Sequence, residues 1–135
     1  MLAEYYFYGL LLHLIGDYVL QSDYMATEKV HKDWPAIFHA AVYSAPFLLI
    51  VEWPYVVSLV FATHALIDRF RLARYVVYLK NFLSPFRYWY TWDNCKSTGY
   101  HNRRPPWLSV WLLIIADNAI HISINTLAIY LSVRT

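Results

Sequence analysis

Four stretches of mostly apolar residues follow one another along the chain, and polar segments separate them. The stretches cover residues 5–22, 34–51, 54–74 and 106–133. Each is close to the roughly 20 residues that an α-helix needs to cross the hydrocarbon core of a bilayer. The pattern therefore predicts an all-α fold, an integral membrane bundle of about four transmembrane helices that forms a single membrane domain over residues 1–135.

The polar segments predict where the chain leaves the membrane. A very tight turn separates the second and third stretches, so these two are expected to form a helical hairpin, although Pro46 interrupts the second. Residues 84–105 are rich in aromatic and basic side chains, and we expect them to form an interfacial loop on the membrane surface. Lys and Arg concentrate in the first and third loops, which the positive-inside rule assigns to the cytoplasm, so both termini are predicted outside.

Composition agrees with a membrane protein, because 59% of the residues are hydrophobic and 15% are charged. Soluble domains carry about 25% charged residues. The formal net charge of +2 is too small to indicate a nucleic-acid partner. Clusters of arginine at residues 69–74 and 103–104 adjoin apolar stretches, which favours anionic lipid headgroups as partners. A single cysteine, Cys95, excludes an internal disulfide and a Cys-based zinc finger.

Three of the predicted helices carry a histidine and an aspartate four residues apart, and the remaining one carries a histidine. These residues are His13 and Asp17, His39, His64 and Asp68, and Asp117 and His121. A spacing of four places both side chains on one face of a helix, one turn apart. Because successive helices alternate in direction, all of these residues are predicted to fall in one layer in the cytoplasmic half of the bundle.

An aspartate inside a membrane helix costs roughly 2.5–3.5 kcal/mol on insertion scales, so three of them need a shared reason. Imidazole nitrogen and carboxylate oxygen suit Zn, Mn or Fe, and helix bundles build metal sites from facing helices. We therefore predict a divalent metal site of one or two ions whose candidate ligands are all seven residues. The alternative for each His–Asp pair is a structural hydrogen bond between helices.

The segment HLIGDYVLQ at residues 13–21, together with residues 64–69 and 117–121, resembles an uncharacterised family of small integral membrane proteins of bacteria and phages. That family is known as a domain of unknown function. More loosely, the His and Asp residues within helices are similar to those of membrane-bound, metal-dependent hydrolases of bacteria. The resemblance implies a multi-pass protein of a bacterial inner membrane or of a host cell membrane.

The leading functional hypothesis is a membrane-embedded, metal-dependent hydrolase that acts on a phosphate ester such as a lipid headgroup. Asp17 is predicted to orient the attacking water as a general base, and Arg69 or Arg71 to neutralise the phosphate. One alternative is a non-enzymatic phage or bacterial protein that modifies the envelope. Another is a proton or ion conduit, which would require a homo-oligomer because four helices alone make a small transporter.

Overall fold

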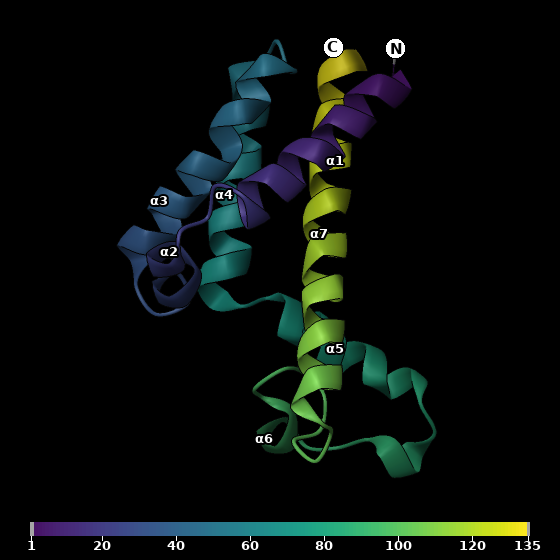
Figure 1. Ribbon diagram of the computed structural model, residues 1–135. Coiled ribbons are helices and arrows are strands. Elements are labelled where there is room, and N and C mark those ends of the chain that lie inside the picture. The colour runs from purple at the N-terminus through teal and green to yellow at the C-terminus, as the bar shows by residue number, and fades with distance from the viewer. Residues whose placement is uncertain (1, 135) are drawn as a thin grey trace. The chain divides into compact units, whose positions relative to one another are not determined.

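The computed structural model describes residues 2–134, which fold into seven α-helices joined by turns and loops (Figure 1). The α-helices are α1 Leu2–Tyr18, α2 Asp23–Glu28, α3 Asp33–Ser44, α4 Pro54–Phe70, α5 Ala73–Lys80, α6 Trp92–Cys95 and α7 Pro106–Arg134. Three short 3₁₀ helices are η1 Ala45–Leu49, η2 Asn81–Leu83 and η3 Phe86–Tyr88. The prediction of an all-α fold is confirmed.

The chain divides into two compact units. The first unit contains the described residues up to Phe70 together with those from His121 onward. The second unit is Arg71–Ile120, so the sequence of α7 contributes to both. Six of the seven predicted ligands belong to the first unit.

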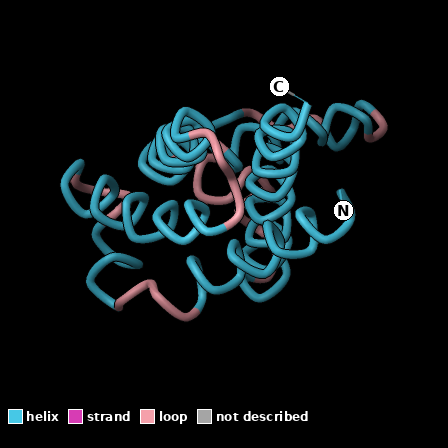
Figure 2. The backbone as a smooth tube through the Cα atoms, turned by 90° about the horizontal axis from the view of Figure 1, so that it is seen from above, coloured by secondary structure: helices cyan, strands magenta, loops and turns pink. Residues whose placement is uncertain are grey.

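A helical hairpin of α3 and α4 forms the centre of the first unit, and the two helices run side by side (Figures 1 and 2). Pro46 has no backbone N–H, so α3 gives way to η1 instead of continuing as one helix over residues 34–51. Pro54 opens α4, where its missing donor costs nothing. The helix stops short of the predicted end at residue 74, because Arg71 adopts a left-handed conformation with a φ of 51°.

An apolar core holds the hairpin against α1 and the C-terminal part of α7. Its buried residues are Tyr43, Phe47, Val51, Val56, Val57, Val60, Ala128 and Ile129. Tyr5 and Leu12 of α1 pack against this core. The chain leaves α1 after Tyr18, and Ser22 caps α2 by accepting a hydrogen bond from the backbone N–H of Met25 at 3.3 Å. The core therefore fixes the four helices that carry the predicted ligands.

The second unit is held by polar contacts to backbone carbonyls. Arg71 donates to Ser97 at 2.7 Å, and Arg74 donates to Lys96 at 3.0 Å. The turn that follows α6 has Gly99 at a φ of 83°, a conformation that other residues rarely adopt. Cys95 is buried in this unit, and burial raises the pKa of its thiol. The predicted interfacial loop at 84–105 thus contains two short helices, η3 and α6.

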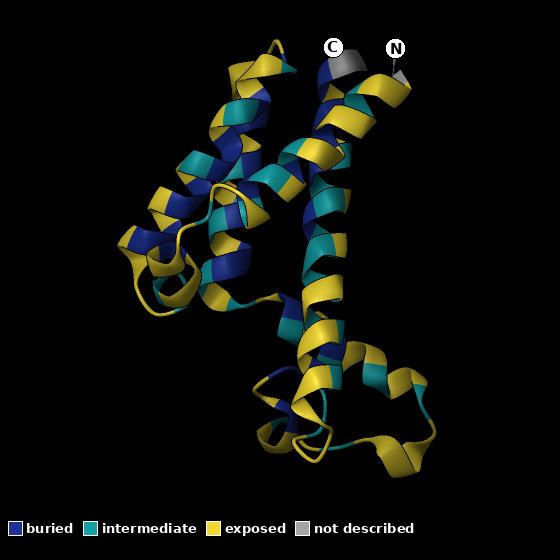
Figure 3. Cartoon of the chain, viewed as in Figure 1, coloured by how far each residue is buried: buried dark blue, intermediate teal, exposed yellow. Residues whose placement is uncertain are grey.

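One helix among residues 2–134 is long and apolar enough to cross a membrane, and it covers the 27 residues Pro106–Ser132. The helices α1 and α4 have 17 residues each, which is shorter than the usual span. Exposed faces run along the helices of the first unit (Figure 3), and they carry large apolar side chains such as Phe7, Phe38 and Leu66. The crossings expected for α1, α3 and α4 stay predictions.

Candidate metal centre

The first unit gathers His and Asp side chains from α1, α3, α4 and α7 into one cluster. Its members are His13 and Asp17 of α1, His39 of α3, His64 and Asp68 of α4, and His121 of α7. The four histidines are at most 2% exposed and Asp68 is 6% exposed. Asp17 is the more accessible carboxylate, with 13% of its side chain exposed. Helix periodicity thus places each pair on an inward face, as its spacing predicts.

At the centre of this cluster, two histidine nitrogens lie close to each other and to one carboxylate oxygen of each aspartate. Nε2 of His39 and Nε2 of His64 are 2.9 Å apart. Oδ1 of Asp17 is 3.2 Å from the first nitrogen and 3.4 Å from the second. Oδ2 of Asp68 is 3.3 Å and 3.1 Å from the same two nitrogens. The four atoms come from three helices, so tertiary packing brings them together.

These separations are comparable to, or slightly shorter than, the distances between ligand atoms that share one metal ion. Ligands about 2.0–2.2 Å from a tetrahedral zinc ion lie roughly 3.3–3.6 Å from one another. Five separations within the set of Asp17, His39, His64 and Asp68 fall between 2.9 and 3.4 Å. A second set of possible ligand atoms, from Asp17, His64 and His121, lies within 4.8 Å. The buried His and Asp groups can therefore hold a metal ion.

Tyr43 supports the cluster from α3. Its ring stacks on the His64 imidazole with 3.6 Å between centroids, and its hydroxyl is 2.7 Å from Nδ1 of His13. Asn125 donates to the same hydroxyl at 2.6 Å, which leaves the hydroxyl hydrogen for His13. A Cβ at Gly16 would collide with the Tyr43 ring. The glycine of the motif at residues 13–21 thus makes room for the side chain that orients two of the histidines.

Comparison with known proteins identifies the family of the chain. Residues 6–133 match the family described as Protein of unknown function (DUF3307). The chain belongs to the DUF3307 family. No curated protein and no solved structure matches it. The resemblance to a family of unknown function over most of the chain is confirmed, whereas the looser similarity to membrane-bound hydrolases stays a prediction.

Lys29 is a member of this chain's cluster that sequence analysis missed. Its Nζ donates to Oδ2 of Asp68 at 2.7 Å and lies 3.3 Å from Nε2 of His39. The residue follows α2, and 15% of its side chain is exposed. Because Lys29 falls in a polar segment between two apolar stretches, the sequence pattern predicts only a basic residue in a loop. Its position brings an ammonium group into the cluster, in contact with the Asp68 carboxylate and the His39 ring.

The two arginines predicted to face a phosphate have other partners. Nε of Arg69 donates to Asp33 at 2.6 Å, and its Nη1 donates to the carbonyl of Val30 at 3.2 Å. Arg71 lies in the second unit and donates to the carbonyl of Ser97. Both guanidinium groups therefore tie loops to helix ends.

Asp117 lies one turn before His121 on α7, in the part of the helix that belongs to the second unit, and it is half-buried. Its role as a ligand stays a prediction.

The second ring nitrogens of two candidate ligands, Nδ1 of His39 and Nδ1 of His64, are buried without a hydrogen-bond partner among the described residues. For these two rings, Nε2 is thus the nitrogen that joins the cluster.

Proposed function

We propose that this DUF3307 protein is a membrane-embedded, metal-dependent hydrolase of phosphate esters. The observation that carries the proposal is the buried group of His39, His64 and Asp68, whose possible ligand atoms all lie within 4.8 Å of one another, with Asp17 within 3.4 Å of both histidine nitrogens. Nitrogen and oxygen ligands of this kind suit one ion of Zn, Mn or Fe, and His121 offers a ligand toward a second. A divalent ion in such a site supplies Lewis-acid chemistry for phosphoryl transfer.

The burial pattern of the first unit supports a location inside the membrane. The His and Asp side chains of its cluster are inside, and the outer faces of α1, α3 and α4 expose Phe7, Leu14, Phe38 and Leu66. An apolar exterior around a polar interior is the arrangement that lipid favours, because charged side chains in a bilayer face the bundle interior. In α7, only 22% of the most apolar window is buried, unlike the core helix of a soluble protein. We therefore propose four crossings, by α1, by α3 with η1, by α4 and by α7.

The residues divide the proposed reaction between them. Asp17 is the more exposed carboxylate, at 13% against 5% for Asp68, so we assign it to accept the proton of the attacking water. The oxygen of that water bonds to phosphorus, the ester P–O bond breaks, and the departing alcohol takes up the proton. Lys29 lies 2.7 Å from Asp68, whereas Arg69 contacts Asp33, so we assign the Lys29 ammonium to neutralise a phosphate oxygen.

A second candidate, a proton conduit, is favoured by the close packing of titratable groups. Asp17, His39, His64, Asp68 and Lys29 form a continuous chain of contacts no longer than 3.4 Å. Chains of His and carboxylate groups within membranes also relay protons. This function predicts a pH-driven proton flux in liposomes that Asp17→Asn abolishes, and it requires no bound metal.

The test of the proposed function is elemental analysis of the full-length protein purified in detergent. Zn, Mn and Fe are measured in the wild type, in a His64→Ala, Asp68→Ala variant, and in a His31→Ala, Asp93→Ala control. The control removes the same two residue types from exposed positions. Turnover of a chromogenic phosphodiester is then followed for the wild type, Asp17→Asn and Lys29→Gln.

The expected result is near-stoichiometric metal in the wild type and the control, and its loss in the cluster variant. Asp17→Asn and Lys29→Gln are expected to retain metal and to lower kcat by at least about 100-fold, the scale of a lost acid–base group. If the wild type binds no metal after reloading, the hydrolase proposal is wrong. A proton flux in liposomes would then support the conduit, and its absence would support a non-enzymatic envelope protein.

A further inference from the structure

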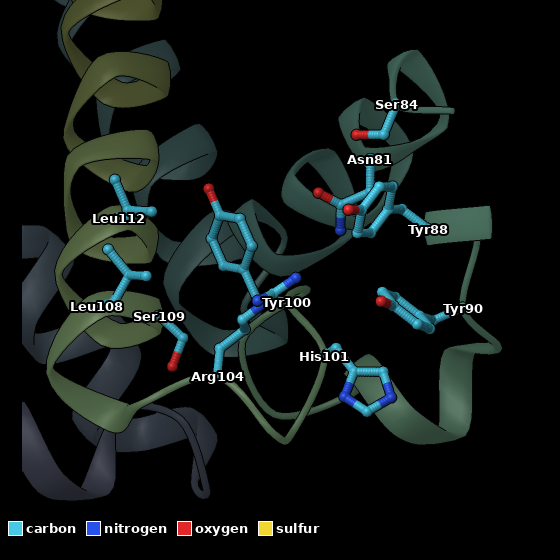
Figure 4. Close-up of a pocket in the computed structure, with 10 residues that line it drawn as sticks. All are labelled: Asn81, Ser84, Tyr88, Tyr90, Tyr100, His101, Arg104, Leu108, Ser109 and Leu112. Carbon is cyan, nitrogen blue, oxygen red and sulfur yellow. The ribbon is translucent and has the colours of Figure 1, made fainter. Parts of the chain in front are cut away.

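A separate pocket lies in the second unit, and it is lined by residues of three segments. It has a volume of about 250 Å³. Its walls come from residues 81–90, from residues 100–104 and from the first turns of α7 (Figure 4). Pockets that enclose drug-sized ligands measure roughly 300–1,000 Å³, so this one suits a small group or one end of a longer molecule.

The pocket offers hydrogen-bond donors that the fold does not use. Within residues 2–134, the Arg104 guanidinium has no hydrogen-bond or ion-pair partner. In the same part of the chain, the hydroxyl groups of Tyr88, Tyr90 and Tyr100 also have none. Arg71, by contrast, is bonded to a backbone carbonyl. A guanidinium and several hydroxyl groups that line one pocket are donors of the kind that bind the oxygens of a phosphate.

The walls of the pocket are fixed before any ligand binds. Asn81 donates to the carbonyl of Gly99 at 2.7 Å, which ties the first segment to the second. Tyr78 donates to the carbonyl of Tyr90 at 2.9 Å. The ring of Tyr90 meets that of His101 edge to face, with 4.1 Å between centroids. Fixed walls reduce the entropy that a ligand would lose by ordering them.

One wall is apolar and continues into the candidate membrane span. Leu108 and Leu112 are four residues apart on α7, so they lie on one face of the stretch Pro106–Ser132. On the opposite side of the pocket are Tyr88 and Tyr90 (Figure 4). A polar end next to an apolar helix face suits an amphiphile whose phosphate enters the pocket and whose chains follow the helix.

The charge of the second unit also favours an anionic ligand. Seven of the eleven Lys and Arg residues of the chain, but two of its nine acidic residues, lie between residues 71 and 120. Basic segments beside a membrane span attract anionic lipids, by about 1 kcal/mol for each residue near the surface. We propose that this pocket binds the phosphate headgroup of an anionic phospholipid, with Arg104 as its charged donor and Tyr100 as a second donor. This site is independent of the proposed metal centre.

The experiment titrates full-length protein in a neutral detergent with three probes. These are dihexanoyl phosphatidylglycerol, dihexanoyl phosphatidylcholine and sn-glycerol 3-phosphate. The variants are Arg104→Gln, Tyr100→Phe and the matched control Arg103→Gln, which removes the same charge one residue away from the pocket. Metal content is measured in every variant.

The proposal expects phosphatidylglycerol to bind more tightly than the other two probes. Arg104→Gln should weaken that binding at least tenfold, because a hydrogen bond between charged groups is lost. Tyr100→Phe should weaken it roughly 2- to 10-fold, and Arg103→Gln less than about twofold. Metal content should not change, so failure of this site is separable from failure of the hydrolase.

Equal losses of phosphatidylglycerol affinity in Arg103→Gln and Arg104→Gln would contradict binding in the pocket, because they would indicate a diffuse charge effect. Unchanged binding in Arg104→Gln would do the same. If that variant does not fold, Tyr100→Phe decides, since it removes one oxygen atom and unchanged binding there refutes the proposal. If sn-glycerol 3-phosphate binds as tightly as phosphatidylglycerol, the ligand of the pocket is a soluble phosphate and the lipid proposal is wrong.

Discussion

The two units of the chain use their charges in opposite ways. The first contains seven of the nine acidic residues, and it buries Asp68 among histidines. The second contains most of the basic residues, and Arg104 of its pocket has no bonded partner among the described residues. A buried carboxylate needs a cation, whereas an accessible arginine attracts an anion. The comparison separates a unit whose buried His and Asp groups can hold a metal ion from a unit whose arginine supports our proposal of an anion site.

Asp68→Ala should have the largest effect on the first unit. The change leaves the Lys29 ammonium, 15% exposed, without the carboxylate that it contacts at 2.7 Å. Breaking a buried ion pair by removing one partner costs about 3–5 kcal/mol of unfolding free energy. Denaturant titration of the detergent-solubilised protein measures the loss. Adding Lys29→Met should recover much of it, and a double variant no more stable than the single one would contradict the pairing.

Gly99→Ala tests whether the second unit is stable by itself. A non-glycine residue at a φ of 83° costs about 1–3 kcal/mol, and the added Cβ would also meet the carbonyl of Arg74. Cys95 is buried and is the only cysteine, so the rate of its alkylation reports opening of this unit. We expect faster alkylation and weaker lipid binding with unchanged metal content. Simultaneous loss of metal would show that the units are not separate.

Gly16→Ala should affect the metal centre through Tyr43. The new methyl group would displace the ring that stacks on His64, at a cost of about 1–3 kcal/mol of unfolding free energy. The control is Gly9→Ala, because there the atom nearest to the added Cβ is the terminal methyl group of the Ile129 side chain and not the Tyr43 ring. Metal titration should show weaker binding in Gly16→Ala alone. Equal effects of the two changes would mean that Tyr43 does not orient the site.

Arg69→Gln should have the smallest effect. Its contact with Asp33 is largely exposed, at 28% and 78% of the two side chains, and exposed pairs contribute about 0.2–1 kcal/mol. Stability, metal content and phosphodiester turnover should therefore change little. A large loss of turnover with intact metal would restore Arg69 to the phosphate-binding role that its position in the sequence suggests.

Helix periodicity explains why so much of the candidate site could be predicted. His13 with Asp17 and His64 with Asp68 are each one turn apart, and that spacing is enough to place each pair on one face. Their convergence could be inferred because buried aspartates in apolar helices require partners. The apolar stretches likewise located α1, the hairpin and α7 to within a few residues.

The remainder depended on tertiary detail that no local pattern carries. Lys29 reaches Asp68 only because α2 folds back toward the cluster, and such a return is not encoded by spacing. The end of α4 before Arg71 was also missed, because the backbone of Arg71 is left-handed at a position without the glycine that usually signals this conformation. The second unit lacks long periodic segments between residues 84 and 105, so its pocket could not be assembled from the sequence.

Gly16 and Tyr43 also constrain how the family can diversify. The two residues lie in different helices, yet the ring of one occupies the space that a side chain of the other would need. A lineage that gains a side chain at position 16 must therefore lose volume at position 43, and with it the hydroxyl that reaches His13. Substitutions at these two positions should consequently appear together in the evolutionary record, as coupled changes and seldom singly.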